Sequence, residues 1–163
     1  MARSQKPRKH YNPKYRSGHV KLRAQPWKIH AVFEPIESIL DEMEQQGTVS
    51  VDQDDAPIFS ELAHNDVYEF VPALGGLIDA FDLHAERHGL PVVTDALKHL
   101  CVKLEKSEML DQHDMAAARR SIAAMKTQAG EMEVDYAFRL VRDVQIKFKI
   151  EECQAIDHLA EAA

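Results

Sequence analysis

Apolar residues recur with the 3.6-residue period of an α-helix along most of the chain. The clearest case lies between Pro35 and Gly47, where the apolar positions i, i+3, i+4 and i+7 are Ile36, Ile39, Leu40 and Met43. Proline suits the first position of a helix, and glycine suits the left-handed residue that ends one. We therefore predict a helix that begins at Pro35 and ends before Gly47.

A second helix is predicted from about Pro72 to His88, where Gly89 and Pro91 follow as stop signals. The positions expected to face the core are Leu74, Leu77, Ile78, Phe81 and Ala85. Within this helix, Gly75 and Gly76 each cost about 1 kcal/mol relative to alanine, which predicts close packing against a neighbouring element.

Three further helices follow. Thr94 is expected to cap the third, Asp111 begins the fourth, which Gly130 follows, and the fifth extends from about Glu133 to His158. The residues at helical spacing are Leu97, Leu100, Cys101 and Leu104; Met115, Ala118, Ile122 and Met125; and Val134, Phe138, Val141, Gln145 and Phe148. The other face of the fifth helix carries a dense cationic group, Arg139, Arg142, Lys147 and Lys149.

The segment between the first two helices has a different pattern. Val49 and Val51 alternate with polar residues, residues 52–55 are polar, and Pro57-Ile58-Phe59 follows, which is typical of a short hairpin. Residues 67–71 either extend that small sheet or join the next helix.

These patterns predict an all-α fold: a compact bundle of about five helices, to which a short β-hairpin near residues 48–60 is a minor addition. The bundle corresponds to residues 31–163, an acidic helical domain of 133 residues, long enough to bury roughly two thirds of its unfolded surface. Cys101 and Cys153 both fall in helical patterns, and we interpret them as reduced, buried side chains.

Residues 1–30 differ from this domain in charge. They contain nine Lys and Arg residues and no Asp or Glu, whereas the rest of the chain contains 11 cations and all 27 carboxylates. The two parts therefore carry formal charges of +9 and −16, which give the net −7. Apolar residues are scarce, and Pro7, Pro13 and Pro26 interrupt any long helix, so we expect an extended basic arm.

Cations interleaved with aromatic rings favour a polyanion as the partner of this arm, because cations neutralise phosphates and bases stack on rings. The candidate nucleic-acid-binding residues are Arg3, Lys6, Arg8, Lys9, Tyr11, Lys14, Tyr15, Arg16, Lys21, Arg23, Trp27 and Lys28. The alternative interpretation is that the arm docks on its own acidic domain or on a second subunit.

The candidate catalytic and metal-binding patterns in the sequence depart from the motifs that such sites require. His84 and His88 lie at i and i+4, but Glu86 sits between them, whereas metalloprotease motifs place the glutamate directly beside a histidine. A calcium loop begun at Asp52 requires Gly and Glu where Pro57 and Ala63 stand. We find no nucleophile elbow or phosphate-binding loop, and we therefore expect no cofactor, no metal and no enzymatic activity.

No apolar run approaches the ~20 residues that cross a bilayer, and the basic start is not followed by a hydrophobic signal segment. We expect a cytoplasmic protein without a membrane partner.

Several stretches resemble, in their layout, small accessory proteins of prophages and other mobile elements. They are the Lys/Arg/Tyr-rich start, Ile-Glu-Ser-Ile-Leu-Asp at 36–41, Val-Pro-Ala-Leu-Gly-Gly-Leu-Ile-Asp at 71–79, and Asp-Met-Ala-Ala-Ala-Arg at 114–119. The resemblance implies a genetic context more than a chemistry.

The leading hypothesis is a non-enzymatic accessory protein whose basic arm contacts RNA or DNA within a larger complex. A second hypothesis is a phage-type regulator or inhibitor whose acidic domain occupies a basic, nucleic-acid-binding surface of a host or phage protein. A third is a metal-dependent enzyme that uses His84 and His88.

Overall fold

The computed structural model describes residues 19–46, 58–61, 66–106 and 108–161. Its elements are the short 3₁₀ helix η2 (Leu22–Ala24), α1 (Pro26–Gln46), β1 (Ile58–Glu61), β2 (Asp66–Glu69), α2 (Phe70–His88), α3 (Asp95–Glu105), α4 (Gln112–Glu131) and α5 (Val134–Glu161). The prediction of an all-α protein with five helices is confirmed.

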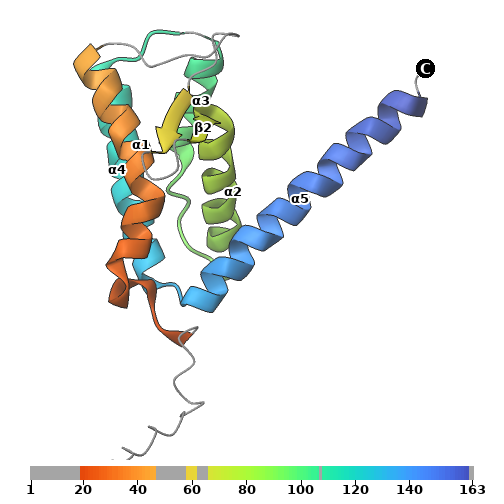
Figure 1. Ribbon diagram of the computed structural model, residues 1–163, viewed down its shortest axis with the longest axis horizontal. Helices are drawn as coiled ribbons and strands as arrows, with labels where there is room; N and C mark the ends of the chain where they lie inside the picture. The colour runs from red at the N-terminus through yellow and green to blue at the C-terminus, as the bar shows by residue number, and fades with distance from the viewer. Residues whose placement is uncertain (1–18, 47–57, 62–65, 107, 162–163) are drawn as a thin grey trace, which may run out of the picture.

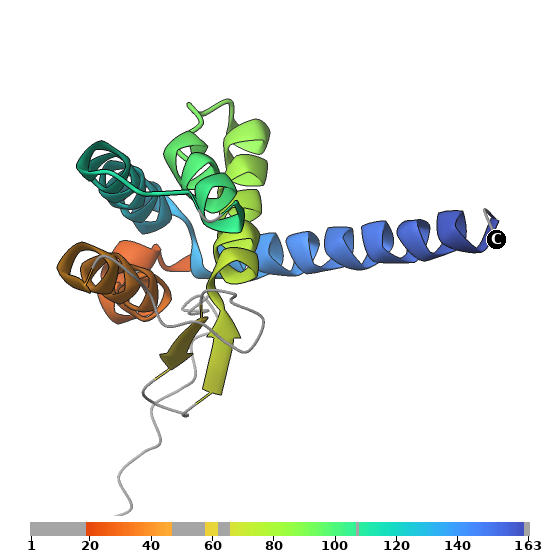
Figure 2. The ribbon, with the colours of Figure 1, turned by 90° about the horizontal axis from the view of Figure 1, so that it is seen from above.

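Four of the helices form the body of the molecule (Figure 1). α1 packs against α4, α4 against α3, and α3 against α2, so each helix contacts its neighbour around one core. The core residues that are almost fully buried include Phe33, Leu40, Phe70, Leu74, Leu97, Leu100, Ile122 and Met125. α5 contacts α2 near its beginning and then leaves the body, as the view from above shows (Figure 2).

The predicted inward faces of the second, third and fourth helices are confirmed. Every residue assigned to them is buried or packed against the core, from Leu74 in α2 to Met125 in α4. Gly89 ends α2 in the left-handed conformation, with φ of 61°. At the start of α4, Asp111 and Asp114 exchange hydrogen bonds with each other's backbone N–H groups, which forms a capping box.

The predicted start of the first helix is wrong. α1 begins at Pro26 and runs through Pro35, so residues 26–30 belong to the helical body and not to an extended arm. A proline inside a helix costs about 3 kcal/mol. Phe33 and Ile36 are buried on either side of Pro35. Burial of such a pair contributes about 1.5–3 kcal/mol per side chain, which offsets the cost.

A hairpin is present among the described residues, and its first strand contains the predicted Ile58-Phe59. β1 pairs antiparallel with β2, and Ile58 stands opposite Glu69. Residues 66–69 therefore extend the sheet, which was one of the two alternatives for that segment. The expected first strand around Val49 and Val51 lies outside the described residues. α2 starts at Phe70, which places Pro72 in its first turn, where the missing N–H is tolerated.

The predictions about Thr94 and the glycine pair have different outcomes. Thr94 is the N-cap residue of α3, as predicted, but it makes no side-chain capping bond; its buried hydroxyl instead donates to Asp82 Oδ1 at 2.5 Å, which ties α3 to α2. Gly75 and Gly76 do not mark a close approach, because a Cβ atom at either position would meet nothing within 4 Å.

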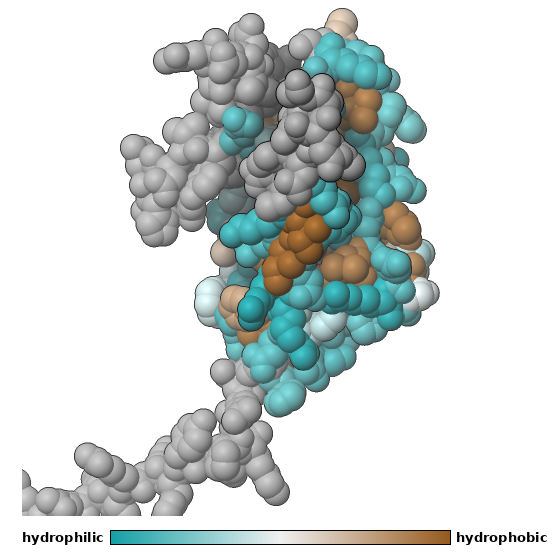
Figure 3. Space-filling model, turned by 90° about the vertical axis from the view of Figure 1, so that its right-hand side faces the viewer, coloured by the Kyte–Doolittle hydropathy of each residue, from teal (hydrophilic) through white to brown (hydrophobic). Residues whose placement is uncertain are grey.

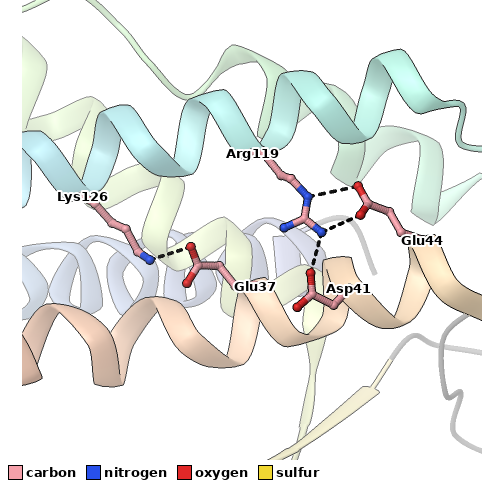
Figure 4. A network of polar contacts seen from close by, with 5 residues as sticks. All are labelled: Glu37, Asp41, Glu44, Arg119 and Lys126. Atoms are coloured by element: carbon pink, nitrogen blue, oxygen red, sulfur yellow. Dashed lines mark hydrogen bonds and ion pairs between the residues drawn. The ribbon is translucent and has the colours of Figure 1, made fainter.

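Ion pairs join α1 to α4 along one side of the body (Figure 4). Arg119 donates to Asp41 Oδ1 at 2.6 Å and to both oxygens of Glu44, and Lys126 donates to Glu37 at 2.5 Å. The hydrogen bond from Arg119 lowers the pKa of Glu44 below its ordinary value. Carboxylates of the acidic domain are thus used internally to align these two helices.

Polar contacts also fix α5 against α2. The buried His84 lies 2.9 Å from the hydroxyl of Tyr136, measured from Nδ1, and the centre of its ring lies 4.7 Å from that of His88, with the two rings tilted by 56°. Arg87 donates to Asp143 Oδ2 at 2.8 Å. Burial, and then the nearby His88, lowers the pKa of His84 below the ordinary histidine value.

We expect Asp111→Ala to destabilise the protein by about 1 kcal/mol, because the first turn of α4 loses its capping acceptor. Urea unfolding followed by circular dichroism measures the change. Glu108→Ala, which removes an exposed carboxylate outside the capping box, is the matched control. Equal midpoints for the two variants would contradict the assigned role of the cap.

We also expect stability to fall below about pH 6.5. Because the folded protein binds a proton at His84 less readily than the unfolded chain, the contribution of neutral His84 is complete above the ordinary pKa and is lost as the pH falls toward the lowered one. Urea midpoints between pH 7.5 and 5.0 should decline less for His84→Gln than for the wild type. His113→Gln, which replaces an exposed histidine, is the control, and an unchanged decline in His84→Gln would refute the assignment.

Candidate nucleic-acid interface and adjoining apolar groove

Residues 19–25 are attached to the junction between α4 and α5. The backbone N–H of Leu22 donates to the carbonyl of Met132 at 2.8 Å, and that of Val134 donates to the carbonyl of Val20 at 3.0 Å. Lys21 and Glu133 form a β-bridge between these two bonds, and Leu22 packs on the core. The basic N-terminal segment therefore joins the body at a defined place, beside the first turn of α5 (Figure 1).

Two cations of the predicted arm are neutralised at this junction. Lys21 and Arg23 both donate to the carboxylate of Glu131, Arg23 at 2.6 Å. The hydrogen bond from Lys21 and the charge of Arg23 lower the pKa of Glu131. His19 lies 3.2 Å from Glu133. These contacts correspond to the alternative in which the arm docks on its own domain, and they apply to residues 19–23 alone.

Trp27 and Lys28 lie on the first turn of α1, where Trp27 faces solvent and Lys28 is half-buried. The Trp27 side chain is 66% exposed, and Phe138, on α5, is 65% exposed. Lys28 Nζ lies 5.4 Å from the centre of the Trp27 ring and 5.5 Å from the centre of the Phe138 ring. Both distances are within the range of a cation–π contact. We call this the Trp27–Lys28–Phe138 cluster.

An apolar groove of about 380 Å³ lies next to the cluster, between α1, α2 and α5. Val32 and Val141 are exposed along it, whereas Phe33, Phe81 and Leu140 are buried beneath. Lys28 is the one charged side chain among its lining residues. A groove of this size and polarity suits an aromatic or aliphatic group.

The cationic face predicted for the fifth helix is present on α5. Arg139, Arg142, Lys147 and Lys149 are all exposed. Lys147 pairs with Glu151 at 3.8 Å, while the structure gives Arg139, Arg142 and Lys149 no ion-pair partner in the part of the chain that it describes. Arg142 follows Phe138 by four residues and so lies on the same side of the helix.

The predicted inward face of α5 is wrong beyond its first residue. Val134 is buried, but Phe138, Val141, Gln145 and Phe148 are exposed, and the residues that pack inward are Leu140 and Val144. Phe138 was therefore missed as a candidate site residue. The sequence did indicate this residue, because Phe138 stands beside Arg139 and Arg142. An aromatic ring among cations is the same pattern that identified Trp27 as a candidate.

The candidate residues of the arm divide into two groups. Those that the structure describes are Lys21, Arg23, Trp27 and Lys28; those outside the described residues are Arg3, Lys6, Arg8, Lys9, Tyr11, Lys14, Tyr15 and Arg16. Within the first group, the structure brings Trp27 and Lys28 together with Phe138, while Lys21 and Arg23 hold the segment to Glu131.

The histidines considered as metal ligands have a structural use. His84 contacts Tyr136 in the interface between α2 and α5, and the His88 ring lies tilted against the His84 ring and edge-on to the Tyr136 ring. A different group, Asp111, His113 and Asp114, has ligand atoms within 4.8 Å of one another. Its two carboxylates form the capping box, and Asp114 also accepts from Lys103 at 2.6 Å, so these residues support a capping role.

Among the described residues, no helix is both long and apolar enough to span a membrane. Comparison of the chain with protein-family models, with curated proteins and with solved structures gave no match.

Proposed function

We propose that the protein is a non-enzymatic accessory protein that binds RNA or DNA through its basic N-terminal segment and the adjoining face of α1 and α5. The observation that carries this proposal is the Trp27–Lys28–Phe138 cluster, which combines two exposed aromatic rings with a cation. It lies where the basic segment joins the body.

The chemistry of the cluster suits a nucleic-acid strand with accessible bases. Aromatic rings stack on unpaired bases and contribute about 1–3 kcal/mol per base, while nearby cations neutralise the phosphates. Lys28 and Arg142 flank Phe138 and would contact the backbone of such a strand. Arg139 extends the cationic surface along α5.

The basic segment adds charge at the same place. Lys21 and Arg23 are bound to Glu131, but the sequence places six further cations before residue 19, without a carboxylate among them. Fixed contacts of Val20 and Leu22 with the α4–α5 junction hold residues 20–22 beside the start of α5, the helix that carries Phe138. We expect a polyanion bound to the basic segment to reach Trp27.

A second candidate function is that of a protein-binding regulator, and the apolar groove favours it. An exposed groove lined by Val32 and Val141 fits an aromatic or aliphatic side chain of a protein partner. The acidic composition of the domain supports this hypothesis only in part, because some of its carboxylates are not free to bind a basic partner. Described carboxylates such as Glu37, Glu44 and Asp82 already pair with cations of the same chain.

We expect binding of single-stranded oligonucleotides to weaken steeply with salt. If about five cations contact phosphates, log K falls with log salt at a slope of about −3.5 for a single strand, and about −4.5 for a duplex. Because Trp27 is the one tryptophan in the chain, its fluorescence should change on binding. Titration of labelled oligonucleotides at several salt concentrations measures both, and a salt-independent interaction with unchanged Trp27 emission would contradict the proposal.

We expect Arg142→Glu to weaken oligonucleotide binding by about tenfold or more, because reversal of one phosphate contact changes an attraction into a repulsion. Arg120→Glu makes the same charge change at an exposed arginine of α4 and serves as the matched control. Fluorescence anisotropy at fixed salt compares the two variants. Equal affinities would remove α5 from the interface.

Deletion of residues 1–18 separates the two candidate functions. Oligonucleotide affinity should fall sharply in the deleted form, whereas a protein partner held in the groove should be retained. Val32→Glu should weaken binding of the protein partner, because it places a charge in the groove. Oligonucleotide affinity should be retained in this variant, because no cation is removed.

A further inference from the structure

The second half of α5 has no packing partner in the described residues. The helix is 28 residues long, which corresponds to about 42 Å, and Val144 is the last of its described side chains to be buried. Residues 145–161 thus form a helical extension that points away from the other four helices (Figures 1 and 2). Isolated helices of this length are marginal in water, because most helix stability in proteins comes from tertiary packing.

The extension carries apolar side chains that its own body does not cover. Ile146, Phe148 and Ile150 are 45%, 46% and 52% exposed. Ile146 and Ile150 are four residues apart and share one open face of α5 with Asp143, Lys147, Glu151 and Gln154. Apolar patches stand out among hydrophilic surface on the side toward which α5 points (Figure 3). A helix with apolar residues on more than one face is usually a buried one.

The charges of α5 change sign at Ile150. Residues 139–149 contain four cations and one carboxylate, a net charge of +3, and residues 151–161 contain four carboxylates and no Lys or Arg, a net charge of −4. This order is opposite to the one that an isolated helix prefers, since the helix dipole favours cations near the C-terminal end. The charge order is therefore better suited to a partner than to the lone helix.

We propose that the extension binds the same segment of a second copy of the chain, with the two helices antiparallel and the symmetry axis near Ile150. In this arrangement, Lys147 and Lys149 of each copy lie against Glu151 and Glu152 of the other, so a charge of +2 meets −2 twice. Ile146 and Ile150 of both copies meet at the centre. A two-fold axis requires such a self-complementary surface, and α5 provides one.

Charge complementarity selects this occupant and orientation. A parallel pair of α5 helices would place cations against cations and carboxylates against carboxylates along both halves, which is destabilising. Within the helix, the one described ion pair of the extension joins Lys147 and Glu151 at 3.8 Å, and both side chains remain more than half exposed. Such a pair contributes little and leaves these charges accessible to the partner.

Sedimentation of the full chain at several concentrations tests the proposal. The wild type should form a dimer, and Ile146→Asn with Ile150→Asn should raise the dimer dissociation constant at least tenfold. Val92→Asn with Val102→Asn, which alters two exposed valines of the body, is the matched control and should leave the dimer unchanged. Circular dichroism should show that the body remains folded in the isoleucine variant, because Ile146 and Ile150 lie beyond Val144, the last described buried residue of α5. A monomeric wild type at about 100 μM, or dimers of unchanged affinity in the isoleucine variant, would overturn the proposal.

Charge reversal provides an independent variant in case the isoleucine changes disturb the helix itself. Lys147→Glu with Lys149→Glu, and separately Glu151→Lys with Glu152→Lys, should each weaken the homodimer. An equimolar mixture of the two variants should form a heterodimer, because opposite charges meet again. Failure of the mixture to associate would count against the proposal.

Crosslinking establishes the orientation. In a Cys153→Ser background, Ile150→Cys should crosslink to its counterpart through a short bis-maleimide, whereas Arg139→Cys should not. Burial raises the pKa of the Cys101 thiol to about 11, so this remaining cysteine should stay unreactive. Crosslinking at both positions would indicate parallel helices, and crosslinking at neither would place the contact elsewhere, for example in the groove; either result overturns the antiparallel arrangement.

Discussion

The short backbone pairing between residues 20–22 and residues 132–134 is the constraint on which the proposed interface depends. Two hydrogen bonds, from Leu22 to Met132 and from Val134 to Val20, join the N-terminal segment to the turn between α4 and α5. They place the start of α1 beside the start of α5, so Lys28 of one helix reaches Phe138 of the other. Without this pairing, the basic segment and the cationic face of α5 would have no fixed relation to each other.

Ion pairs within the chain align the helices of the body and attach the basic segment to it. Carboxylates at the interfaces between helices, such as Glu37 and Glu44, bind cations of the body and align α1 with α4. Glu131 does the same for Lys21 and Arg23 at the end of the basic segment. Neutralising these two cations fixes residues 19–23 to the body, while Arg142 of α5, on the same side of the helix as Phe138, has no ion-pair partner among the described residues.

Periodicity predicted the parts of the fold in which one apolar face serves one core, as in α2, α3 and α4. It failed at Pro35, because burial of Phe33 and Ile36 outweighs the local preference of proline for a helix start. Local sequence placed Thr94 correctly at the N-cap of α3, but it did not predict that the hydroxyl bonds to Asp82, because no local pattern encodes a tertiary contact. For the interface, sequence selected Trp27 and Lys28 but not Phe138, because a ring at helical spacing was assigned to the core.

The error on α5 has a physical cause that bears on how the molecule assembles. The stripe of Phe138, Val141, Gln145 and Phe148 has the spacing of a buried face, yet Leu140 and Val144 make the contact with the body. A helix has room for two apolar faces, and periodicity alone does not tell which of them the chain itself covers. The order of charges does distinguish them: Lys147 and Lys149 before Ile150, and Glu151 and Glu152 after it, follow the last buried residue of α5 in the sequence. These charges gain most from an antiparallel copy of the same helix.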